Sequence, residues 1–452
     1  MAASASAVPS QARVVNRWIQ LLAGMIAMMA IANLQYAWTL FVKPLQANFH
    51  ATLTAVQWTF TAFVFAETWL VPFDGFLVDK IGPRRMMLVG GIMVGVGWVG
   101  SGYAATLPQL YSYYIAGGIG AGIVYGATIG NALKWFPDHR GLCVGLTAGS
   151  YGVGTALTIA PIAKMLRVSG YQHTFITWGY IQGAVVILAA LLIVKPPAEW
   201  VPPGWSQKED ELNKLHHLHT SHLDCTPMQM LRTSSFWLIY FMMTIVAFAG
   251  LVVTAQLAPI AQFYKVDSVM IAFGMSALVF AVEVDRVLNG FTRPFWGWVS
   301  DHIGRENTMF VAFAIQALAI FAWMQFMNRP VWFILLSGLT FFSWGEIFSL
   351  FPAITGDLFG KTWATTNYGI VYTAKGLASL FAGPVAAMAS VKTGSWMPIF
   401  WVMIVCDAVA ALLALLVLKP VAERTIARNE QLRAQALASA LDQKSKPVRG
   451  VA

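Results

Sequence analysis

The stretch "FTRPFWGWVSDHIGR" at residues 291–305 has an altered second copy, "PFDGFLVDKIGPRR", at residues 72–85. Both contain Pro-Phe-x-Gly-x-x-x-Asp-x-Ile-Gly, and Gly75 and Gly297 stand 222 residues apart in a chain of 452 residues. A repeat at about half the chain length indicates two related halves. Arg293 has no counterpart in the first copy, where Val71 stands. The repeat therefore reflects architecture, whereas the lone arginine calls for another explanation.

The composition is that of a membrane protein. Apolar residues make up 58% of the chain and charged residues only 11%, whereas a soluble domain carries about 25% charged residues. The first apolar stretch is long enough to span a bilayer, so we expect it to be retained as a helix and not cleaved as a signal peptide.

Twelve apolar stretches are long enough to cross a bilayer as helices, which takes about 20 residues. We therefore predict an all-α membrane protein with two six-helix halves, at residues 18–195 and 234–418, a central cytoplasmic loop at 196–233, and tails at 1–17 and 419–452. The predicted spans are residues 18–42, 55–78, 86–105, 110–134, 142–165, 173–195, 235–260, 269–298, 308–327, 331–356, 366–390 and 397–418.

The distribution of basic residues predicts the orientation. With both termini in the cytoplasm, twenty lysines and arginines lie in cytoplasmic segments and six on the opposite side. This excess predicts cytoplasmic N- and C-termini. The net charge of +9 then faces the anionic lipid surface of the cytoplasmic leaflet. No basic patch is interleaved with aromatic residues, so the sequence does not favour nucleic-acid binding.

The repeated motif falls between the second and third spans of each half. Its glycines permit a sharp turn and a close approach of helices, and its aspartate suits a helix N-terminus. The motif residues are Gly75, Asp79, Gly82, Arg84 and Arg85 in the first half and Gly297, Asp301, Gly304 and Arg305 in the second.

Ionisable side chains at membrane depth cost roughly 2.5–3.5 kcal/mol each on insertion scales, so each is a functional hypothesis. Lys375 lies mid-span, with no acid in its own predicted helix. Tyr368, Tyr372 and Ser379 share its helix face at −7, −3 and +4. We expect Lys375 to await an anionic ligand; a pair with an acid on another helix is the alternative.

Arg293 lies a helical turn inside the cytoplasmic turn, and its planar guanidinium suits a carboxylate. Arg286 shares its face, but Glu283 three residues earlier can neutralise it. We therefore predict an ion pair for Arg286 and leave Arg293 as a free cation. Two uncompensated cations, Arg293 and Lys375, predict a small dianionic ligand with one carboxylate for each.

Polar and aromatic residues supply walls for such a site. Gln35 and Tyr36 interrupt an apolar run in the first span, and Tyr125 and Tyr151 are phenols within glycine-rich helices that need hydrogen-bond partners. Trp344 and Phe348 stand four residues apart in the tenth span, while Glu346 points away from Trp344 toward neighbouring helices.

Six segments carry a narrower resemblance: "NLQYAWTL", "GIVYGATIGNALKWFPDHRGL", "TAGSYGVG", "NGFTRPFWGWVSDHIGR", "FSWGEIFSLFP" and "NYGIVYTAKGLAS". They resemble the oxalate/formate antiporter family of the major facilitator superfamily, and the similarity covers roughly residues 16–420. The repeated motif resembles the cytoplasmic-loop motif of that superfamily.

The resemblance implies the superfamily fold, alternating access, and exchange of oxalate for formate. It assigns the essential cations to Arg293 and Lys375, and the site walls to Gln35, Tyr36, Tyr125, Tyr151, Trp344 and Tyr372. It also implies that Asp79, Arg84, Arg85 and Asp301 brace the outward-open state; shaping a tight turn is the alternative. Phe348 replaces a tyrosine of the family pattern and Tyr372 a tryptophan, while Glu346, Glu283, Asp285 and Arg286 replace uncharged residues.

These departures leave a second hypothesis open, a proton-coupled monocarboxylate importer that uses Glu283, Asp285 or Glu346 as proton carrier. A membrane sensor on a transporter fold is a third. No nucleophile–base motif or phosphate-binding loop appears, so we expect no enzyme and no cofactor. His216, His217, His219 and His222 fit a solvated loop better than a metal site. We expect a functional monomer in a bacterial cytoplasmic (inner) membrane.

Overall fold

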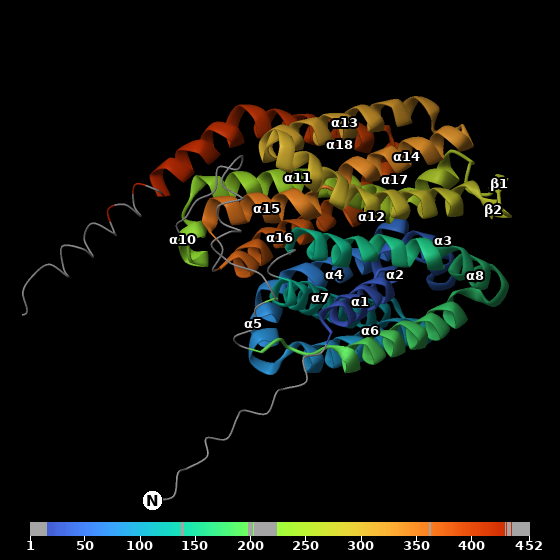
Figure 1. Cartoon of the computed structure of the whole chain (residues 1–452). Helices are drawn as coiled ribbons and strands as arrows, with labels where there is room; N and C mark the ends of the chain where they lie inside the picture. The colour runs from blue at the N-terminus through green and yellow to red at the C-terminus, as the bar shows by residue number, and fades with distance from the viewer. Residues whose placement is uncertain are drawn as a thin grey trace, which may run out of the picture.

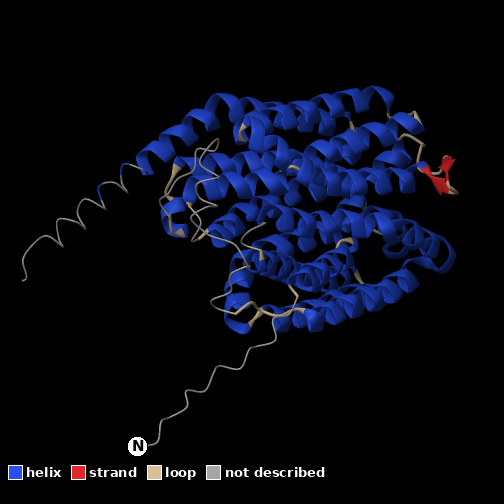
Figure 2. Cartoon of the chain, viewed as in Figure 1, coloured by secondary structure: helices blue, strands red, loops and turns tan. Residues whose placement is uncertain are grey.

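The computed structural model describes residues 16–136, 140–197, 202, 224–360, 363–429, 431 and 435. Within these ranges the protein is helical apart from loops and one two-stranded antiparallel sheet, drawn in red at one end of the molecule in Figure 2. The helical character follows from the long apolar runs, since backbone groups in a bilayer must be satisfied within their own segment.

The N-terminal helices form one bundle, blue to green in Figure 1. The long helix α8 contains a kink at Gly170, whose φ of 77° and ψ of 171° are not helical, so the chain reverses there. The elements of this bundle are α1 (Arg17–Ile31), α2 (Asn33–Tyr36), α3 (Trp38–Phe49), α4 (Leu53–Trp69), α5 (Val71–Ile81), α6 (Pro83–Tyr103), α7 (Leu107–Trp135) and α8 (Arg140–Leu192).

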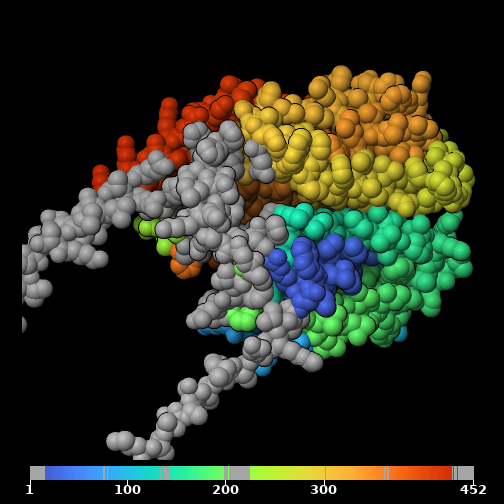
Figure 3. All heavy atoms as spheres, in the orientation of Figure 1, coloured from blue at the N-terminus to red at the C-terminus, as the bar shows by residue number. Residues whose placement is uncertain are grey.

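The C-terminal helices form a second bundle, yellow to red in Figure 1, which lies against the first over the length of the molecule (Figure 3). Its elements are α10 (Pro227–Leu231), α11 (Ser234–Phe263), β1 (Met270–Ala272), β2 (Met275–Ser276), α12 (Ala277–Ile303), α13 (Arg305–Phe326), α14 (Pro330–Trp344), α15 (Ile347–Phe359), α16 (Ala364–Leu380), η1 (Phe381–Val385), α17 (Ala386–Thr393), α18 (Met397–Leu413) and η2 (Ala414–Leu418).

Helical elements occupy all twelve predicted spans. Eight helices of the described chain are long and apolar enough to cross a membrane, and one of them, Leu142–Leu192, has 51 residues, enough for two crossings. The protein is therefore a multi-pass, all-α membrane protein. The number of twelve crossings and the cytoplasmic placement of the termini remain predictions.

The predicted span at 269–298 is wrong at its first residues. Met270–Ala272 pairs with Met275–Ser276 as a hairpin, and α12 begins only at Ala277. Phe273 and Gly274 have φ values of 51° and 69°, which a helix cannot accommodate. The apolar residues before Gly274 made this turn look like part of a helix.

The repeated motif adopts the same turn in both halves. Gly82 ends α5 with φ 95° and ψ 149°, and Gly304 ends α12 with φ 89° and ψ 157°. Only glycine adopts such angles without strain, so the predicted sharp turns are confirmed.

Two of the three motif arginines, Arg84 and Arg305, contact groups within their own halves. Arg84 donates through Nε to the carbonyl of Ile193 at 3.0 Å and through Nη2 to that of Leu191 at 2.7 Å, whereas Arg305 pairs with Asp357 at 3.2 Å. The surroundings of Gly75 and the side chains of Asp79 and Asp301 lie outside the described part. Bracing by this motif therefore remains a prediction.

Small residues let the two halves approach closely. A Cβ added at Gly152 of α8 would lie 2.6 Å from the Arg286 carbonyl oxygen of α12, and one at Gly376 of α16 would lie 2.3 Å from Thr68 Oγ1 of α4. Thr61 of α4 also donates to the carbonyl of Ser379 at 2.8 Å. These contacts place α4, α8, α12 and α16 along the interface where the functional side chains meet.

Candidate functional site between the two halves

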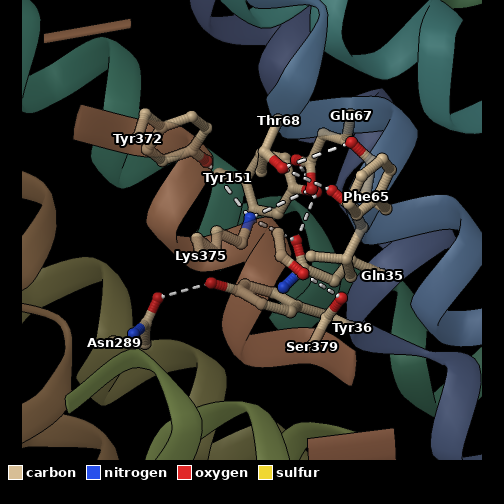
Figure 4. A network of polar contacts seen from close by, with 12 residues as sticks. Gln35, Tyr36, Phe65, Glu67, Thr68, Tyr151, Asn289, Tyr372, Lys375 and Ser379 are labelled. Atoms are coloured by element: carbon tan, nitrogen blue, oxygen red, sulfur yellow. Dashed lines mark hydrogen bonds and ion pairs between the residues drawn. The ribbon is translucent and has the colours of Figure 1, made fainter. Parts of the chain in front are cut away.

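A network of polar side chains surrounds Lys375 at the interface (Figure 4). Lys375 Nζ donates to Glu67 Oε2 at 3.0 Å, to Gln35 Oε1 at 3.0 Å and to Tyr372 Oη at 3.1 Å. Tyr151 reaches the same network, with its hydroxyl 3.3 Å from Gln35 Oε1 and 3.5 Å from Glu67 Oε1. Both halves thus contribute to one ammonium-centred cluster.

The prediction that Lys375 lacks a protein countercharge is wrong in this conformation. Glu67, from α4 of the opposite half, forms an ion pair with it, and the two side chains are only 1% and 2% exposed. The relative rotation of α4 and α16 decides this pairing, and a single sequence does not contain that rotation. A lysine in apolar surroundings needs such a partner because an unpaired buried charge costs several kcal/mol.

Arg293 sits on α12 and reaches across to the N-terminal half. Its Nη1 donates to the carbonyl of Ala148 on α8, and its Nη2 lies 3.5 Å from Asn289 Oδ1. Its guanidinium lies over the Phe348 ring, 4.4 Å from the centroid. No carboxylate of the described residues pairs with Arg293, as the sequence predicts.

Arg286 departs from its predicted role. Its guanidinium lies between two aromatic rings, 4.0 Å from the Tyr36 centroid and 4.3 Å from that of Phe341. The predicted pair with Glu283 does not form: within the described ranges, no nitrogen of the Arg286 guanidinium has a hydrogen-bond partner, and Glu283 Oε2 is also unpartnered. The interface buries Arg286 completely, so the side chain turns away from Glu283 and into the space between the halves.

Aromatic rings enclose these cations. Tyr36 and Tyr151 meet edge to face at 5.0 Å, and Tyr125 stacks on Tyr372 at 5.7 Å. Phe348 links Tyr372 to Trp344, with centroids 6.3 and 5.3 Å away.

The eight residues predicted to bind substrate therefore lie in one contiguous region, and each is buried. They are Gln35, Tyr36, Tyr125, Tyr151, Arg293, Trp344, Tyr372 and Lys375. Their role in binding remains a prediction.

Two further residues, Glu67 and Asn289, lie in this region, although the sequence analysis did not predict them as site residues. Glu67 is an acid within the predicted span at 55–78, but the sequence does not identify its partner. Asn289 lies four residues before Arg293 on the same helix face, and its Oδ1 accepts the Tyr36 hydroxyl at 3.0 Å. The i, i+4 spacing of a buried asparagine and arginine was the available signal.

The three acids predicted as proton carriers have different surroundings. Glu283 is half-buried and Asp285 accepts from Ser337 at 2.9 Å, while Glu346 is fully buried. The described chain holds no group of three or more His, Cys, Asp or Glu side chains that could bind a metal ion. The histidines at 216–222 lie outside the described residues.

Comparison with known proteins supplies the family. The model of the major facilitator superfamily matches residues 21–284 and 286–449. The chain is also 35% identical over 405 residues to the oxalate:formate antiporter of Oxalobacter formigenes, covering 89% of this chain and 92% of that protein. The chain belongs to the oxalate/formate antiporter family of the major facilitator superfamily. It is therefore a membrane transporter of small organic anions and not an enzyme.

More distant relatives share the superfamily. An uncharacterized MFS-type transporter of Escherichia coli is 25% identical over 366 residues, covering 81% of this chain and 86% of that protein. The mouse monocarboxylate transporter 14 is 20% identical over 435 residues, covering 82% and 83%. A match over most of both chains shows that the likeness extends across the two halves.

Proposed function

We propose that this transporter exchanges a small dicarboxylate, oxalate, for the monocarboxylate formate by alternating access. The observation that carries the proposal is the concentration of cations at the interface. Arg286, Arg293 and Lys375 approach one aromatic-walled region, where Glu67 is the acid that forms an ion pair with one of them. The name of the bacterial relative supports oxalate and formate as the anions.

The charge balance differs from that predicted from sequence but still suits a dianion. Since Glu67 neutralises Lys375, the two guanidinium groups of Arg286 and Arg293 carry the remaining positive charge. Asp285 lies near Arg286, but its carboxylate is oriented toward Ser337 of α14. Two planar guanidinium groups can each take a carboxylate through paired hydrogen bonds.

In this mechanism Glu67 occupies the position beside Lys375 that a substrate carboxylate takes when it binds. In the absence of substrate it keeps Lys375 paired, which avoids a buried bare ammonium. A substrate carboxylate competes with Glu67 for the same ammonium, so binding loosens a contact between the halves. An exchanger needs such a link between occupancy and movement, because a ligand shifts an equilibrium only through its differential contacts.

Vesicle exchange tests this function. Purified protein reconstituted into liposomes should take up labelled oxalate faster when the vesicles contain formate or oxalate than when they contain neither. Equal uptake into loaded and empty vesicles would contradict exchange. Counterflow with a panel of one- to four-carbon carboxylates identifies the preferred pair.

Proton-coupled import of a monocarboxylate is the second possibility, and the Glu67–Lys375 pair favours it. Protonation of Glu67 would free Lys375 for a single carboxylate, and distant relatives are named monocarboxylate transporters. Uptake driven by a pH gradient and independent of internal anion would support this alternative.

We further propose cytoplasmic termini, a monomeric functional unit and location in a bacterial inner membrane. One chain supplies every side chain of the site, which supports the monomer. The excess of basic residues in the predicted cytoplasmic segments supports the orientation, and the bacterial source of the antiporter relative supports the membrane.

A further inference from the structure

Two carboxyl groups outside the central site are buried without partners. Glu346 lies at the break between α14, which ends at Trp344, and α15, which begins at Ile347. Asp407 lies on α18. Both side chains are 0% exposed, and none of their four carboxyl oxygens has a hydrogen-bond partner among the residues that the structure describes.

Within the described ranges, no basic side chain forms an ion pair with these groups. The helices packed against α15 and α18 are α11, α12, α13, α16 and α17, and none of their basic side chains in the described chain forms an ion pair with Glu346 or Asp407. The titratable and charged groups on these helices are Tyr240, Glu283, Asp285, Arg286, Arg293, Asp301, His302, Arg305, Glu306, Tyr368, Tyr372, Lys375 and Lys392.

Burial without a partner disfavours the charged form of each carboxyl group. An ionised carboxylate that is buried without a partner costs several kcal/mol. A bound proton removes this cost. We propose that Glu346 and Asp407 are proton-binding carboxyl groups, each of which retains its proton in this conformation.

The position of Glu346 connects this carboxyl group to the central site. A Cβ added at the adjacent Gly345 would lie 2.0 Å from Thr292 Cγ2 and 2.9 Å from Asn289 Nδ2, so the helix break rests directly on α12. Asn289 holds Tyr36 and Arg293. Loss of the proton from Glu346 would place a negative charge in the apolar break between α14 and α15. The break would then shift against Asn289, which orients Arg293.

Infrared spectroscopy of the purified protein tests the two carboxyl groups without any substrate, so the result is independent of which anion is carried. Glu346→Gln and Asp407→Asn keep side-chain volume. The difference spectrum of wild type minus the double variant at neutral pH should contain the carbonyl band of a protonated carboxylic acid. A difference that contains only carboxylate bands would overturn the proposal. Glu423→Gln, at an exposed acid, serves as the control and should leave the acid band unchanged.

The pH dependence of transport separates proton binding by Glu346 and Asp407 from a purely structural role of these residues. The double variant should remain folded and lose the part of the pH dependence of exchange that the wild type shows, whereas Glu423→Gln should retain it. An unchanged pH profile in the double variant would contradict a link to the site. A sodium-dependent spectral change in the wild type at constant pH would show a metal cation in place of the proton and would also overturn the proposal.

Discussion

At the residue scale, the ion pair between Glu67 and Lys375 is the contact on which the site depends most. Each side chain is at most 2% exposed, and they come from opposite halves. A buried pair adds little net stability, but removal of one partner leaves an uncompensated charge that costs about 3–5 kcal/mol. The pair therefore ties the charge state of the site to the contact between the halves.

Lys375→Gln should lower thermal stability in detergent and abolish oxalate exchange, because it leaves Glu67 buried and unpaired. The double variant Glu67→Gln/Lys375→Gln should recover most of the stability but not the exchange. Differential scanning calorimetry of the purified variants measures the thermal stability, and uptake into vesicles measures the oxalate exchange. Normal exchange by the double variant would remove Lys375 from the substrate site.

Arg286→Gln and Arg293→Gln should each weaken oxalate binding. Loss of one member of a buried charge pair costs about 2–5 kcal/mol, which corresponds to at least about thirtyfold in Kd. Titration calorimetry of the purified protein checks this. The control Arg329→Gln, an exposed arginine at the start of α14, should bind as wild type. Undiminished binding by Arg286→Gln would leave Arg293 as the sole guanidinium of the site.

Residue identity could be predicted better than residue pairing. A charge in an apolar span stands out in a sequence, so Arg293, Lys375 and the acids were identifiable as functional candidates. Which of them meet depends on helix rotation across the interface. For that reason the sequence paired Arg286 with its helix neighbour Glu283, whereas the fold places Arg286 between Tyr36 and Phe341.

At the element scale, the crossing of α8 and α12 determines how closely the halves approach. Gly152 of α8 lies against the backbone of α12 at Arg286 and Gly290, with space for no side chain. Since both of these α12 residues flank the cationic site, the crossing positions the guanidinium of Arg286 relative to Tyr36.

Gly152→Ala should therefore destabilise the described conformation by about 1–3 kcal/mol through overpacking and slow exchange. Gly145→Ala is the matched control on the same helix, because nothing lies within 4 Å of a Cβ added there. Thermal unfolding and exchange rates compare the two variants. Equal stability of both would show that the crossing tolerates more space than the structure indicates.

Helix existence was predictable from apolar length, but local breaks were not. The glycine turns at Gly82 and Gly304 were expected because the repeat places them at matching positions. In contrast, the break between α14 and α15 and the hairpin before α12 lie within apolar runs. Their geometry depends on packing against α11 and α12, where Trp344 covers Gly250.

At the scale of the whole molecule, two bundles meet along one interface (Figure 1), and both bundles contribute predicted site residues. All eight predicted binding residues are buried, so the site is closed to solvent in this conformation. Exchange then requires the bundles to separate at alternate ends, which each time breaks contacts such as that of Glu67 with Lys375. The repeat in the sequence predicts the two halves but not which end is open.

Exchange of a dianion for a monoanion moves net charge, and the dependence of transport on membrane potential tests this most directly. One charge moved across 100 mV corresponds to about 2.3 kcal/mol. In formate-loaded vesicles, a potential that is positive inside should accelerate labelled oxalate uptake, while oxalate-for-oxalate exchange should not respond. Oxalate uptake into formate-loaded vesicles that does not change with membrane potential would contradict the proposed exchange. Uptake that proceeds without any internal anion would contradict it as well.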